Sequence, residues 1–432
     1  MEAGARILIV GGGYVGMYAA LRLERRLGGT AHRMTLAAPE NFMQYQPFLP
    51  EVASGTIDPR AIVVPLRQVL KRTDVLIGEV TRIDHDRREA HVKVPDGPDL
   101  VEPYDVLILG AGSQSRVLPI PGLAEHAIGF KTIAEAIYLR NRVLSRLDVA
   151  DEEPDPTRRR AALTFVFVGG GYAGVEALGE LEDLARDAIA TYPNLREERM
   201  RWMLVDAAPR ILPELGDGLA HYAKRRLEER GIEVLVGTRL ESVEHGVVRL
   251  SDGQAFAAHT LVWTAGVKPS PLPRESGLPV DDHGRLRVDQ YLRVVGRPDA
   301  WGAGDVAAVP DVSTGGIAPP TAQHALREAR ALGDNVAATL LGGPLRAFRW
   351  TNKGAVASLG HYKGVANPLG IRIKGFPAWL LHRTYHLLYM PTIGRRARIA
   401  LDWTIALLFP RDIAQLGSLQ YPREAFERSF RP

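Results

Sequence analysis

Two short glycine-rich segments, 158 residues apart, constrain the fold of this chain more than any other feature. The first follows the apolar run 7–10 and reads GGGYVG, and the second follows the apolar run 165–168 and reads GGGYAG. Each lies between a β-branched run, which predicts a buried strand, and an amphipathic pattern, which predicts a helix. The chain is therefore expected to contain the same strand–turn–helix unit twice.

The glycines of both segments match the pattern G-x-G-x-x-G. They are Gly11, Gly13 and Gly16 in the first turn, and Gly169, Gly171 and Gly174 in the second. In such a turn the first glycine allows a sharp bend, the second lets the backbone approach a pyrophosphate, and the third lets the helix pack on the strand. The helix N-terminus then supplies free amides to the anion. One copy can be a glycine-rich turn without a ligand, but two copies predict two dinucleotide sites.

An acidic residue after the second strand of such a unit can bind the ribose hydroxyls. Behind the second turn Asp206 ends the apolar run 203–205, and its charge would repel a 2′-phosphate, which favours NAD over NADP. Asp206 lies 32 residues after Gly174, and we expect a lengthened helix and loop over 185–201 to account for this spacing. Arg210 nearby leaves NADPH as an alternative.

Behind the first turn, Ala38 occupies the expected position of the acid, so Glu40 is the available ribose ligand. Three further apolar runs end in small residues, which suits strands that end towards a ligand. These ends are Ala111 and Gly112, Ala265 and Gly266, and Gly304 followed by Asp305.

None of the 432 residues is a cysteine. This excludes disulfides, thiolate metal ligands, cysteine nucleophiles and a dithiol relay. The 12 histidines show no metal-ligand spacing such as H-E-x-x-H, so we expect no metal, and His324, His361, His382 and His386 are interpreted as packing or surface residues.

The C-terminal part carries the positive charge of the chain. Residues 371–432 contain 10 Arg and Lys against 4 Asp and Glu, whereas the net charge of the whole chain is only +4. Two apolar, aromatic-rich stretches, 376–390 and 399–409, flank three arginines and are short for crossing a bilayer. They predict amphipathic helices on an anionic membrane surface, with packing on the protein or a homodimer interface as the alternative. No recognised nucleic-acid-binding motif accompanies the charge, so no nucleic-acid partner is expected.

These features resemble the two-dinucleotide-binding FAD flavoproteins and, more closely, the type II NADH dehydrogenases, which are NADH:quinone oxidoreductases. The likeness covers nearly the whole chain. It rests on both GGGYxG turns and on the segments 41–55, 104–114, 301–307, 319–329, 353–366 and 375–389.

The resemblance implies an α/β fold with two Rossmann-like domains, the second inserted in the first, and a C-terminal α/β region with membrane-associating amphipathic helices. The expected bounds are 1–150 and 276–345 for the FAD-binding domain, 160–275 for the NADH-binding domain, and 346–432 for the C-terminal region.

The same resemblance assigns roles to residues. Glu176 would stand between nicotinamide and flavin, although a carboxylate stabilised by the helix dipole is an alternative reading. Gln323 would lie by the flavin and the quinone, where it could bind a quinone carbonyl or only orient the flavin. Lys353 could stabilise the charge of the reduced flavin, with an exposed lysine that has no such role as the alternative reading. Arg327 stands where relatives often carry a second glutamine. The expected cofactor-binding set is Gly11, Gly13, Gly16, Glu40, Gln46, Val80, Ala111, Gly112, Asp305, Ala322 and Gln323 towards FAD, and Gly169, Gly171, Gly174, Asp206, Ala265 and Gly266 towards NADH.

The implied activity is hydride transfer from NADH to FAD and electron transfer to menaquinone or ubiquinone, without proton pumping. The implied place is the cytoplasmic face of the plasma membrane, as a peripheral protein that could form a homodimer. Two other functions stay open at this point: a soluble NAD(P)H-dependent reductase for a ferredoxin- or rubredoxin-type protein, and an NADH-sensing flavoprotein.

Overall fold

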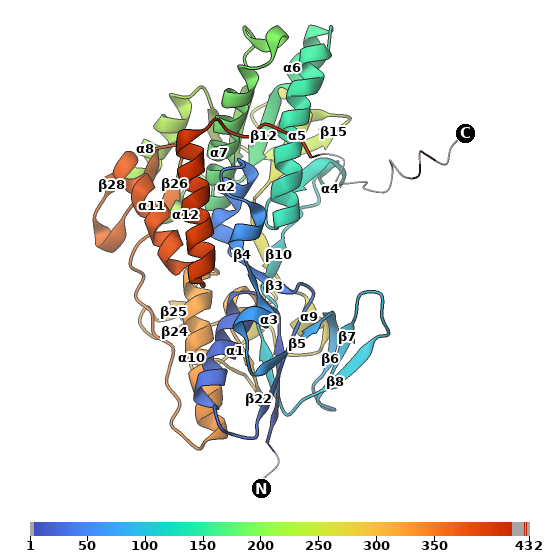
Figure 1. The fold of residues 1–432 in the computed structure, drawn as a ribbon, viewed down its shortest axis with the longest axis vertical. Helices are drawn as coiled ribbons and strands as arrows, with labels where there is room; N and C mark the ends of the chain where they lie inside the picture. Colours follow the sequence, from blue (N-terminus) through green and yellow to red (C-terminus); the bar gives the residue numbers. More distant parts are fainter. Residues whose placement is uncertain (1–3, 417–426, 428, 430–432) are drawn as a thin grey trace. The chain divides into compact units, whose positions relative to one another are not determined.

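The computed structural model in Figure 1 describes residues 4–416, 427 and 429. By its contacts the chain divides into two compact units. Unit 1 comprises Met1–Gln44, Val63–Gln114 and Val267–Asn352, and unit 2 comprises Tyr45–Ile62, Ser115–Gly266 and Lys353–Pro432. Each unit is built around a parallel sheet that carries one of the glycine turns.

Unit 1 contains a six-stranded sheet in the order β21-β22-β9-β1-β2-β5. Its strands are β1 (Arg6–Val10), β2 (Arg33–Ala38), β5 (Thr73–Ile77), β9 (Val106–Leu109), β21 (Arg293–Val294) and β22 (Arg297–Gly302). All neighbours are parallel except β21 and β22. Four of the five residues of β1 are buried, as expected for a strand covered on both faces.

The helices and shorter strands of unit 1 complete this layer structure. Helices α1 (Tyr14–Arg26) and α10 (Ala322–Leu340) pack along each other and are joined by ion pairs from Arg22 and Arg26 to Asp334. The remaining elements are β3 (Phe42–Gln44), β4 (Val63–Pro65), α3 (Leu66–Val69), β6 (Glu79–Asp84), β7 (Glu89–Lys93), β8 (Leu100–Pro103), β10 (Ser113–Ser115, at the unit boundary), β19 (Val267–Pro269), α9 (Leu272–Glu275), β20 (Leu286–Arg287), η5 (Gly304–Val306), β23 (Ala307–Ala308), β24 (Pro310–Asp311) and β25 (Gly316–Ile317).

Unit 2 contains a five-stranded parallel sheet in the order β11-β18-β12-β13-β14. Its strands are β11 (Ala127–Gly129), β12 (Thr164–Val168), β13 (Arg201–Asp206), β14 (Glu233–Val236) and β18 (Thr260–Trp263). Every residue of β12 is buried, and the core of the unit includes Val166, Met203 and Leu261 from three adjacent strands. The long helix α7 (Tyr172–Ile189) follows the second glycine turn directly.

Other helices of unit 2 begin at recognisable caps. Helix α5 (Ile133–Glu152) starts with a capping box formed by Thr132 and Glu135. The Asp155 side chain accepts a hydrogen bond from the Thr157 amide at the start of α6 (Pro156–Ala162). The remaining elements before residue 353 are η1 (Gln46–Phe48), α2 (Leu49–Ala53), η2 (Pro59–Ile62), α4 (Leu123–His126), η3 (Pro193–Leu195), η4 (Pro213–Leu215), α8 (Asp217–Glu228), β15 (Leu240–Glu244), β16 (Val247–Leu250) and β17 (Ala255–Ala257).

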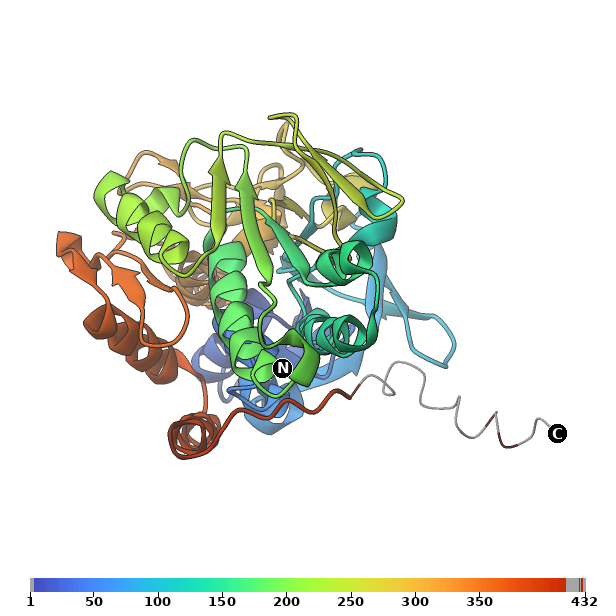
Figure 2. The same cartoon turned by 90° about the horizontal axis from the view of Figure 1, so that it is seen from above.

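The C-terminal part of unit 2 has a small antiparallel sheet followed by two helices. The sheet consists of β26 (Val356–Ser358), β27 (Gly364–Ala366) and β28 (Ile373–Lys374), with η6 (Pro368–Gly370) between the last two strands. Helices α11 (Phe376–Tyr389) and α12 (Ile393–Leu408) follow, and Figure 2 looks along the axis of α12. Among the described residues, no helix is both long enough and apolar enough to span a membrane.

Helix α12 corrects one sequence expectation. It begins at Ile393, six residues before the apolar stretch that starts at residue 399, so the three arginines between the two apolar stretches belong to the helix. The physical reason is that Arg and Ala propagate a helix well, whereas Pro391 favours extended backbone at Met390, which is where α11 ends.

The α/β fold with two Rossmann-like units is confirmed. The compact units group the chain differently from the expected domains, because 45–62 and 115–150 belong with the second glycine turn and 353–432 joins the same unit. The bounds at residues 150, 160, 275 and 345 remain predictions.

Candidate dinucleotide sites and a buried ionic cluster

The first glycine turn connects β1 to α1 and has the geometry of a phosphate cradle. Gly11 has a φ of +102°, and a Cβ there would lie 2.4 Å from the Gly110 carbonyl oxygen. A Cβ on Gly16 would lie 1.7 Å from the Gly11 oxygen, whereas a Cβ on Gly13 would meet no heavy atom within 4 Å. The first and third glycines therefore pack on the protein itself, and the second faces open space at the start of a helix, as a bound pyrophosphate requires.

The second glycine turn repeats this geometry in unit 2. Gly169 has a φ of +119°, a Cβ on Gly174 would lie 1.9 Å from the Gly169 oxygen, and a Cβ on Gly171 would meet nothing within 4 Å. The Thr264 hydroxyl is positioned to donate to the carbonyls of Val168 and Gly169, at 3.0 and 3.1 Å. Thr264 stands where Gly110 stands in the first repeat, and the sequence pattern places it with Ala265 and Gly266 at the end of a strand. Its hydrogen bonds to the turn were not predicted.

The strand ends of unit 1 bring the other expected FAD residues to the same edge of the sheet. Since β22, β9 and β1 are adjacent and parallel, Asp305, Ala111 and Gly112 follow strands that end beside the first turn. The Asp305 carboxylate accepts a hydrogen bond of 2.6 Å from the Ser113 hydroxyl. Glu40 is exposed just after β2, and its carbonyl lies 3.8 Å from the position of a Cβ on Gly12. This is the edge at which open α/β sheets bind ligands.

A cavity of about 330 Å³ lies beside these residues in unit 1. Val80 of β6, Ala111 and Ser113 line it together with residues of the 270–275 segment. Of the expected cofactor-binding residues, Val80 and Ala111 are thus brought together.

The expected residues Ala322 and Gln323 begin helix α10, which is capped by the Thr321 side chain. The main-chain carbonyl of Gln323 accepts a hydrogen bond of 2.8 Å from the Arg327 guanidinium. The central carbon of this guanidinium lies 3.9 Å from the centre of the Trp350 ring. Arg327 is therefore held by a stacking contact as well as by its own helix.

Asp206 lies at the end of β13, directly against the second glycine turn. Its carboxylate accepts hydrogen bonds from the amides of Gly170 and Ala208. Ala265 and Gly266 follow β18, the strand parallel and adjacent to β12, so they end at the same edge. Arg210 forms an ion pair with Asp217 of α8.

Three expected flavin-side residues belong to unit 2, whereas the first glycine turn belongs to unit 1. Gln46 is exposed at the start of η1, Lys353 is exposed, and Glu176 is buried on α7. Their roles towards the flavin therefore stay predictions.

Glu176 forms a buried ion pair with His382 of α11. Its Oε1 atom lies 3.0 Å from His382 Nε2 and accepts a 2.9 Å hydrogen bond from the Ser358 amide. Glu176 is 7% exposed and His382 is 2% exposed. Burial lowers the pKa of His382, but the charges of Glu176 and Glu51 outweigh burial, so the pKa is raised.

A second buried pair joins α2 to the C-terminal helices. The Glu51 carboxylate accepts a hydrogen bond of 2.5 Å from Trp403 and lies 3.1 Å from the Arg383 guanidinium. The Arg383 guanidinium also stacks on the rings of Trp379 and Trp403, with its central carbon 4.2 and 4.8 Å from the ring centres. Stacking of this kind on aromatic rings is suited to arginine and not to lysine.

His386 lies one helical turn after His382, and its pKa is shifted in the opposite direction. Its Nδ1 lies 3.2 Å from the Tyr45 hydroxyl, and the two imidazole centres are 4.6 Å apart. Burial, together with the charge of His382, lowers the pKa of His386 well below its usual range. One ring of the pair therefore favours the charged form and the other the neutral form.

Glu180 occupies the next turn of α7 after Glu176 and is buried between two serines. The hydroxyls of Ser54 and Ser358 lie 3.2 and 3.3 Å from its two carboxylate oxygens. Burial raises the pKa of Glu180, and the neighbouring Glu51 adds to this effect.

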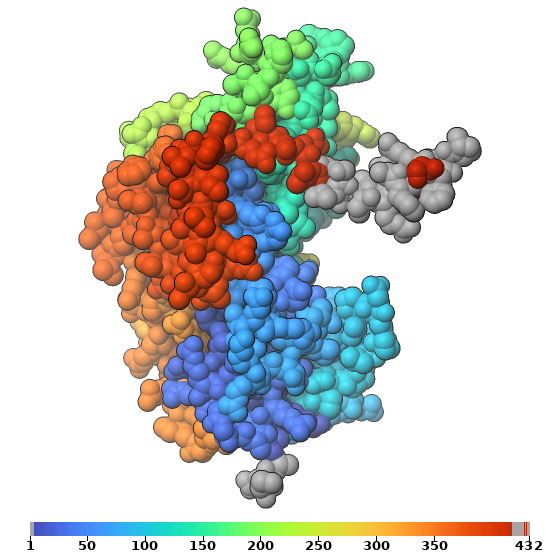
Figure 3. Space-filling model, in the orientation of Figure 1, coloured from blue at the N-terminus to red at the C-terminus, as the bar shows by residue number. Residues whose placement is uncertain are grey.

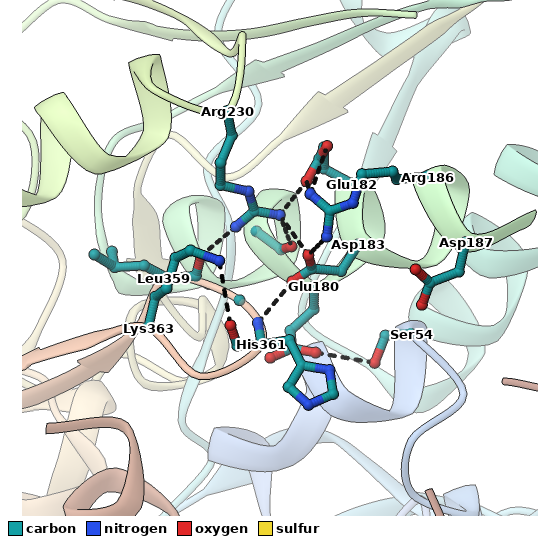
Figure 4. A network of polar contacts seen from close by, with 12 residues as sticks. Ser54, Glu180, Glu182, Asp183, Arg186, Asp187, Arg230, Leu359, His361 and Lys363 are labelled. Atoms are coloured by element: carbon teal, nitrogen blue, oxygen red, sulfur yellow. Dashed lines mark hydrogen bonds and ion pairs between the residues drawn. The ribbon is translucent and has the colours of Figure 1, made fainter. Parts of the chain in front are cut away.

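Further along α7, Figure 4 shows Arg230 beside both Glu182 and Asp183. Arg230 also donates to the Leu359 carbonyl, and the His361 amide donates to Asp183 at 2.6 Å. These contacts attach the segment after β26 to α7.

Most of these buried contacts of Glu51, Glu176, Glu180 and Asp183 were not predicted from the sequence. The interpretation of His382 as a packing or surface residue omitted its ion pair with Glu176. A usable signal was present, because Glu176, Glu180 and Asp183 have the spacing i, i+4, i+7 that places them on one face of an otherwise apolar helix. The partners come from residues far away in the chain. Within the part of the chain that the structure describes, no group of three or more histidine, aspartate and glutamate residues could hold a metal ion.

Comparison with known proteins agrees with this geometry. Residues 5–329 match the family described as pyridine nucleotide-disulphide oxidoreductase. The chain is 33% identical to the type II NADH:quinone oxidoreductase Ndh of Mycobacterium tuberculosis, over 94% of this chain and 89% of that one. It is 30% identical to the demethylphylloquinone reductase NdbB of Synechocystis, over 93% and 96%.

A solved structure shares the fold. NDH2 from Plasmodium falciparum in complex with NADH superposes with a TM-score of 0.88 at 18% identity, over 95% of this chain and 99% of that chain. The glycine turns, the two parallel sheets and the whole-length similarity agree, and the chain belongs to the type II NADH:quinone oxidoreductases of the pyridine nucleotide-disulphide oxidoreductase family.

Proposed function

We propose that this chain takes hydride from NADH onto FAD and passes the electrons to a membrane quinone without pumping protons. The observation that carries the proposal is the pair of cradle-shaped glycine turns in a chain without cysteine. Two dinucleotides can be held, and no thiol is present to accept the electrons. The names of the relatives, NADH:quinone oxidoreductase and demethylphylloquinone reductase, favour a quinone as the acceptor.

The residues of unit 1 fit FAD. The open space at Gly13, the amides that begin α1, and Asp305 at the adjacent strand end would hold its pyrophosphate and ribityl chain. The second turn and Asp206 would hold NADH. When bound, FAD supplies the centre that accepts a hydride and releases electrons to the quinone.

Four side chains are proposed to serve the reaction. Glu176 and its partner His382 can hold or move a proton at the 3.0 Å contact between them, because the pair is shielded from water. Gln323 would donate a hydrogen bond to a quinone carbonyl. Lys353 would place positive charge near the reduced flavin.

The C-terminal helices support attachment to a membrane surface. One face of α12, made of Ile399, Asp402 and Trp403, is directed towards the protein. Ile399 is buried, the Asp402 carboxylate accepts a hydrogen bond from the Asp58 amide, and the Trp403 indole donates one to the Glu51 carboxylate. The opposite face exposes more than half of Leu401, Ile405 and Leu408. Helices α11 and α12 form one continuous outer surface of this unit in Figure 3.

Three arginines precede that apolar face on α12. Exposed apolar side chains beside arginines suit the boundary between anionic headgroups and acyl chains. We therefore propose that the protein is peripheral, on the cytoplasmic face of the plasma membrane. A homodimer through the same face is the alternative arrangement.

An acceptor assay tests the catalytic proposal. The purified protein should show a flavin absorption spectrum and oxidise NADH much faster with a soluble quinone than with dioxygen alone. A rate that quinone does not raise above the dioxygen background would contradict quinone reduction. Stimulation by a ferredoxin or rubredoxin instead would favour the soluble reductase.

Vesicle sedimentation tests the membrane proposal. The protein should sediment with vesicles containing phosphatidylglycerol, and less at high salt. Replacing Leu401, Ile405 and Leu408 together by Ser should abolish this, whereas Leu341→Ser, an equally exposed apolar position at the end of α10, should not. Retained binding by the triple variant would contradict the proposal. Light scattering would show a homodimer interface if the triple variant became monomeric instead.

A further inference from the structure

Glu328 is a buried carboxyl group on α10 to which the proposed function assigns no role. It is 2% exposed, and its Oε2 atom accepts a 2.7 Å hydrogen bond from the Gly304 amide. A buried residue of this kind is normally paired with a cation. Here a backbone amide of another segment is its recorded partner, which points to a role in fixing that segment.

The segment that Glu328 contacts is the turn that presents Asp305. Gly304 has a φ of +73° and begins η5, and a Cβ on Gly304 would lie 2.7 Å from the Val15 side chain. Val15 lies two residues after Gly13 on α1, and its Cβ lies 2.8 Å from the position of a Cβ on Gly110. The Gly304 turn is therefore packed tightly against the first glycine turn, and Glu328 contacts it from α10.

We propose that Glu328 is a positioning residue for FAD, which holds the Gly304 turn and hence Asp305 in the orientation that the cofactor needs. The inference rests on the proposed binding of FAD at the first glycine turn. Without an acceptor, the buried Gly304 amide would be left unsatisfied, and the turn would relax towards other conformations.

The charged groups around Glu328 make its proposed role depend on pH. The negative charges of Asp305 on η5 and Asp311 on β24 act on it, and the α1 cations Arg22 and Arg26 are engaged by Asp334, more than a turn further along α10. Burial raises the pKa of Glu328 to about 7. The hydrogen bond from the Gly304 amide opposes this rise, and the charges of the two aspartates add to it.

A bound pyrophosphate would add negative charge near this carboxyl group and favour its protonated form. FAD affinity should therefore decrease as the pH rises through neutrality, because binding is linked to uptake of a proton.

The test is release of FAD from the holoenzyme, followed by flavin fluorescence during dilution at pH 6 and pH 8. Glu328→Gln keeps an oxygen that accepts from the Gly304 amide, whereas Glu328→Met has a similar size and lacks one. At pH 6 we expect the FAD affinity of the Glu328→Gln variant to stay within about threefold of that of the natural protein, and the affinity of the Glu328→Met variant to be about tenfold weaker. We expect the natural protein to lose affinity by roughly three- to tenfold between pH 6 and pH 8, and Gln to show no such loss.

Asp334→Asn is the matched control on the same helix, because it removes the pairs with Arg22 and Arg26 without touching the Gly304 turn. It should reduce thermal stability and leave FAD affinity and its pH dependence unchanged. If Met binds FAD as tightly as the natural protein, or if Gln retains the pH dependence, the role of Glu328 is wrong. If Met does not fold, the pH dependence of Gln decides alone. Failure of the natural protein to bind FAD at all would instead refute the proposed function.

Discussion

The carboxylate of Glu176 and the imidazole of His382 face each other at 3.0 Å inside unit 2, although 206 positions separate them in the chain. The contact joins the helix that follows the second glycine turn to the first of the two C-terminal helices. Both groups are almost completely buried, so removing either partner leaves an uncompensated charge in a region of low dielectric constant. The contact therefore couples the stability of the C-terminal region to the charge state of one histidine.

Replacement of His382 by Gln should destabilise the protein in a pH-dependent way. The pKa of His382 is raised in the folded protein, so the protonated ring contributes its full stability below the unfolded value of about 6.5. This contribution is lost as the pH rises through the folded pKa. We expect His382→Gln to lower the free energy of unfolding by about 3 kcal/mol at pH 6 and by less at pH 9.

Urea denaturation of both proteins across this pH range measures the difference. His221→Gln, an exposed histidine on α8, is the control and should change little. An equal loss at pH 6 and pH 9 would show that the ion pair does not stabilise the fold.

Replacement of Glu180 by Gln should stabilise the protein at alkaline pH. Burial raises the pKa of Glu180 in the folded protein above its value in the unfolded chain. The contribution of Glu180 to stability is therefore complete below the unfolded pKa, and it is lost as the pH rises towards the folded pKa. A glutamine can keep the contacts with Ser54 and Ser358 and cannot ionise. We expect the free energy of unfolding to be equal at pH 5 and about 1 kcal/mol higher for the variant at pH 8.

Glu182→Gln provides the opposite control on the same helix, because Glu182 is paired with Arg230 and Arg186. This variant should be destabilised at both pH values. A Glu180→Gln protein less stable than the natural protein at pH 8 would mean that the ionised carboxylate is needed in the cluster.

Alanine at the second glycine of each turn should separate the two dinucleotide sites. A Cβ at Gly13 or Gly171 meets no protein atom within 4 Å, so both variants should fold. The methyl group would instead occupy the space of a pyrophosphate. We expect Gly13→Ala to be isolated with little flavin, and Gly171→Ala to retain flavin but require an NADH concentration at least about tenfold higher for half-maximal rate.

Flavin absorbance and NADH titration measure these two outcomes. Gly16→Ala is the control for misfolding, because its Cβ would lie 1.7 Å from the Gly11 oxygen. Loss of flavin in Gly171→Ala, with flavin retained in Gly13→Ala, would reverse the assignment of the two turns.

The parts of this protein that follow local rules could be predicted from the sequence. The glycine turns need residues without a Cβ at fixed spacing, and the buried strands on either side need continuous apolar runs, so the two Rossmann-like units are visible as short patterns. The position of Asp206 at the end of a strand next to the turn could be predicted for the same reason, whereas its contact with NADH stays a prediction. The start of α12 was misplaced because an apolar stretch marks a buried or membrane-facing side and not the helix N-terminus.

The buried ionic contacts could not be predicted, because each one joins segments that are distant in the chain. His382 and Arg383 meet carboxylates on α7 and α2, and Glu328 meets an amide that precedes it by 24 residues. No local pattern specifies which acid will face which base. The grouping of 45–62 with the second turn has the same cause, since it depends on the packing of α2 against α7.

The choice between NADH and NADPH should depend on two acidic residues near the second turn. Asp206 accepts hydrogen bonds from two amides there, and its charge opposes a 2′-phosphate. Asp217 disfavours a 2′-phosphate indirectly, because it forms an ion pair with Arg210, which could otherwise bind the phosphate. Asp206→Asn keeps an acceptor oxygen and removes the charge, so we expect kcat/KM for NADPH to rise and that for NADH to fall, each by roughly tenfold.

Asp217→Asn should release Arg210 and raise kcat/KM for NADPH, with NADH little affected, since an exposed ion pair contributes little to stability. The double variant should prefer NADPH the most, because loss of repulsion and gain of attraction act on the same phosphate. Steady-state rates with both nucleotides measure all three ratios. If Asp206→Asn leaves the ratio of the two kcat/KM values unchanged, Asp206 does not face the ribose, and its contacts with the Gly170 and Ala208 amides are its whole function.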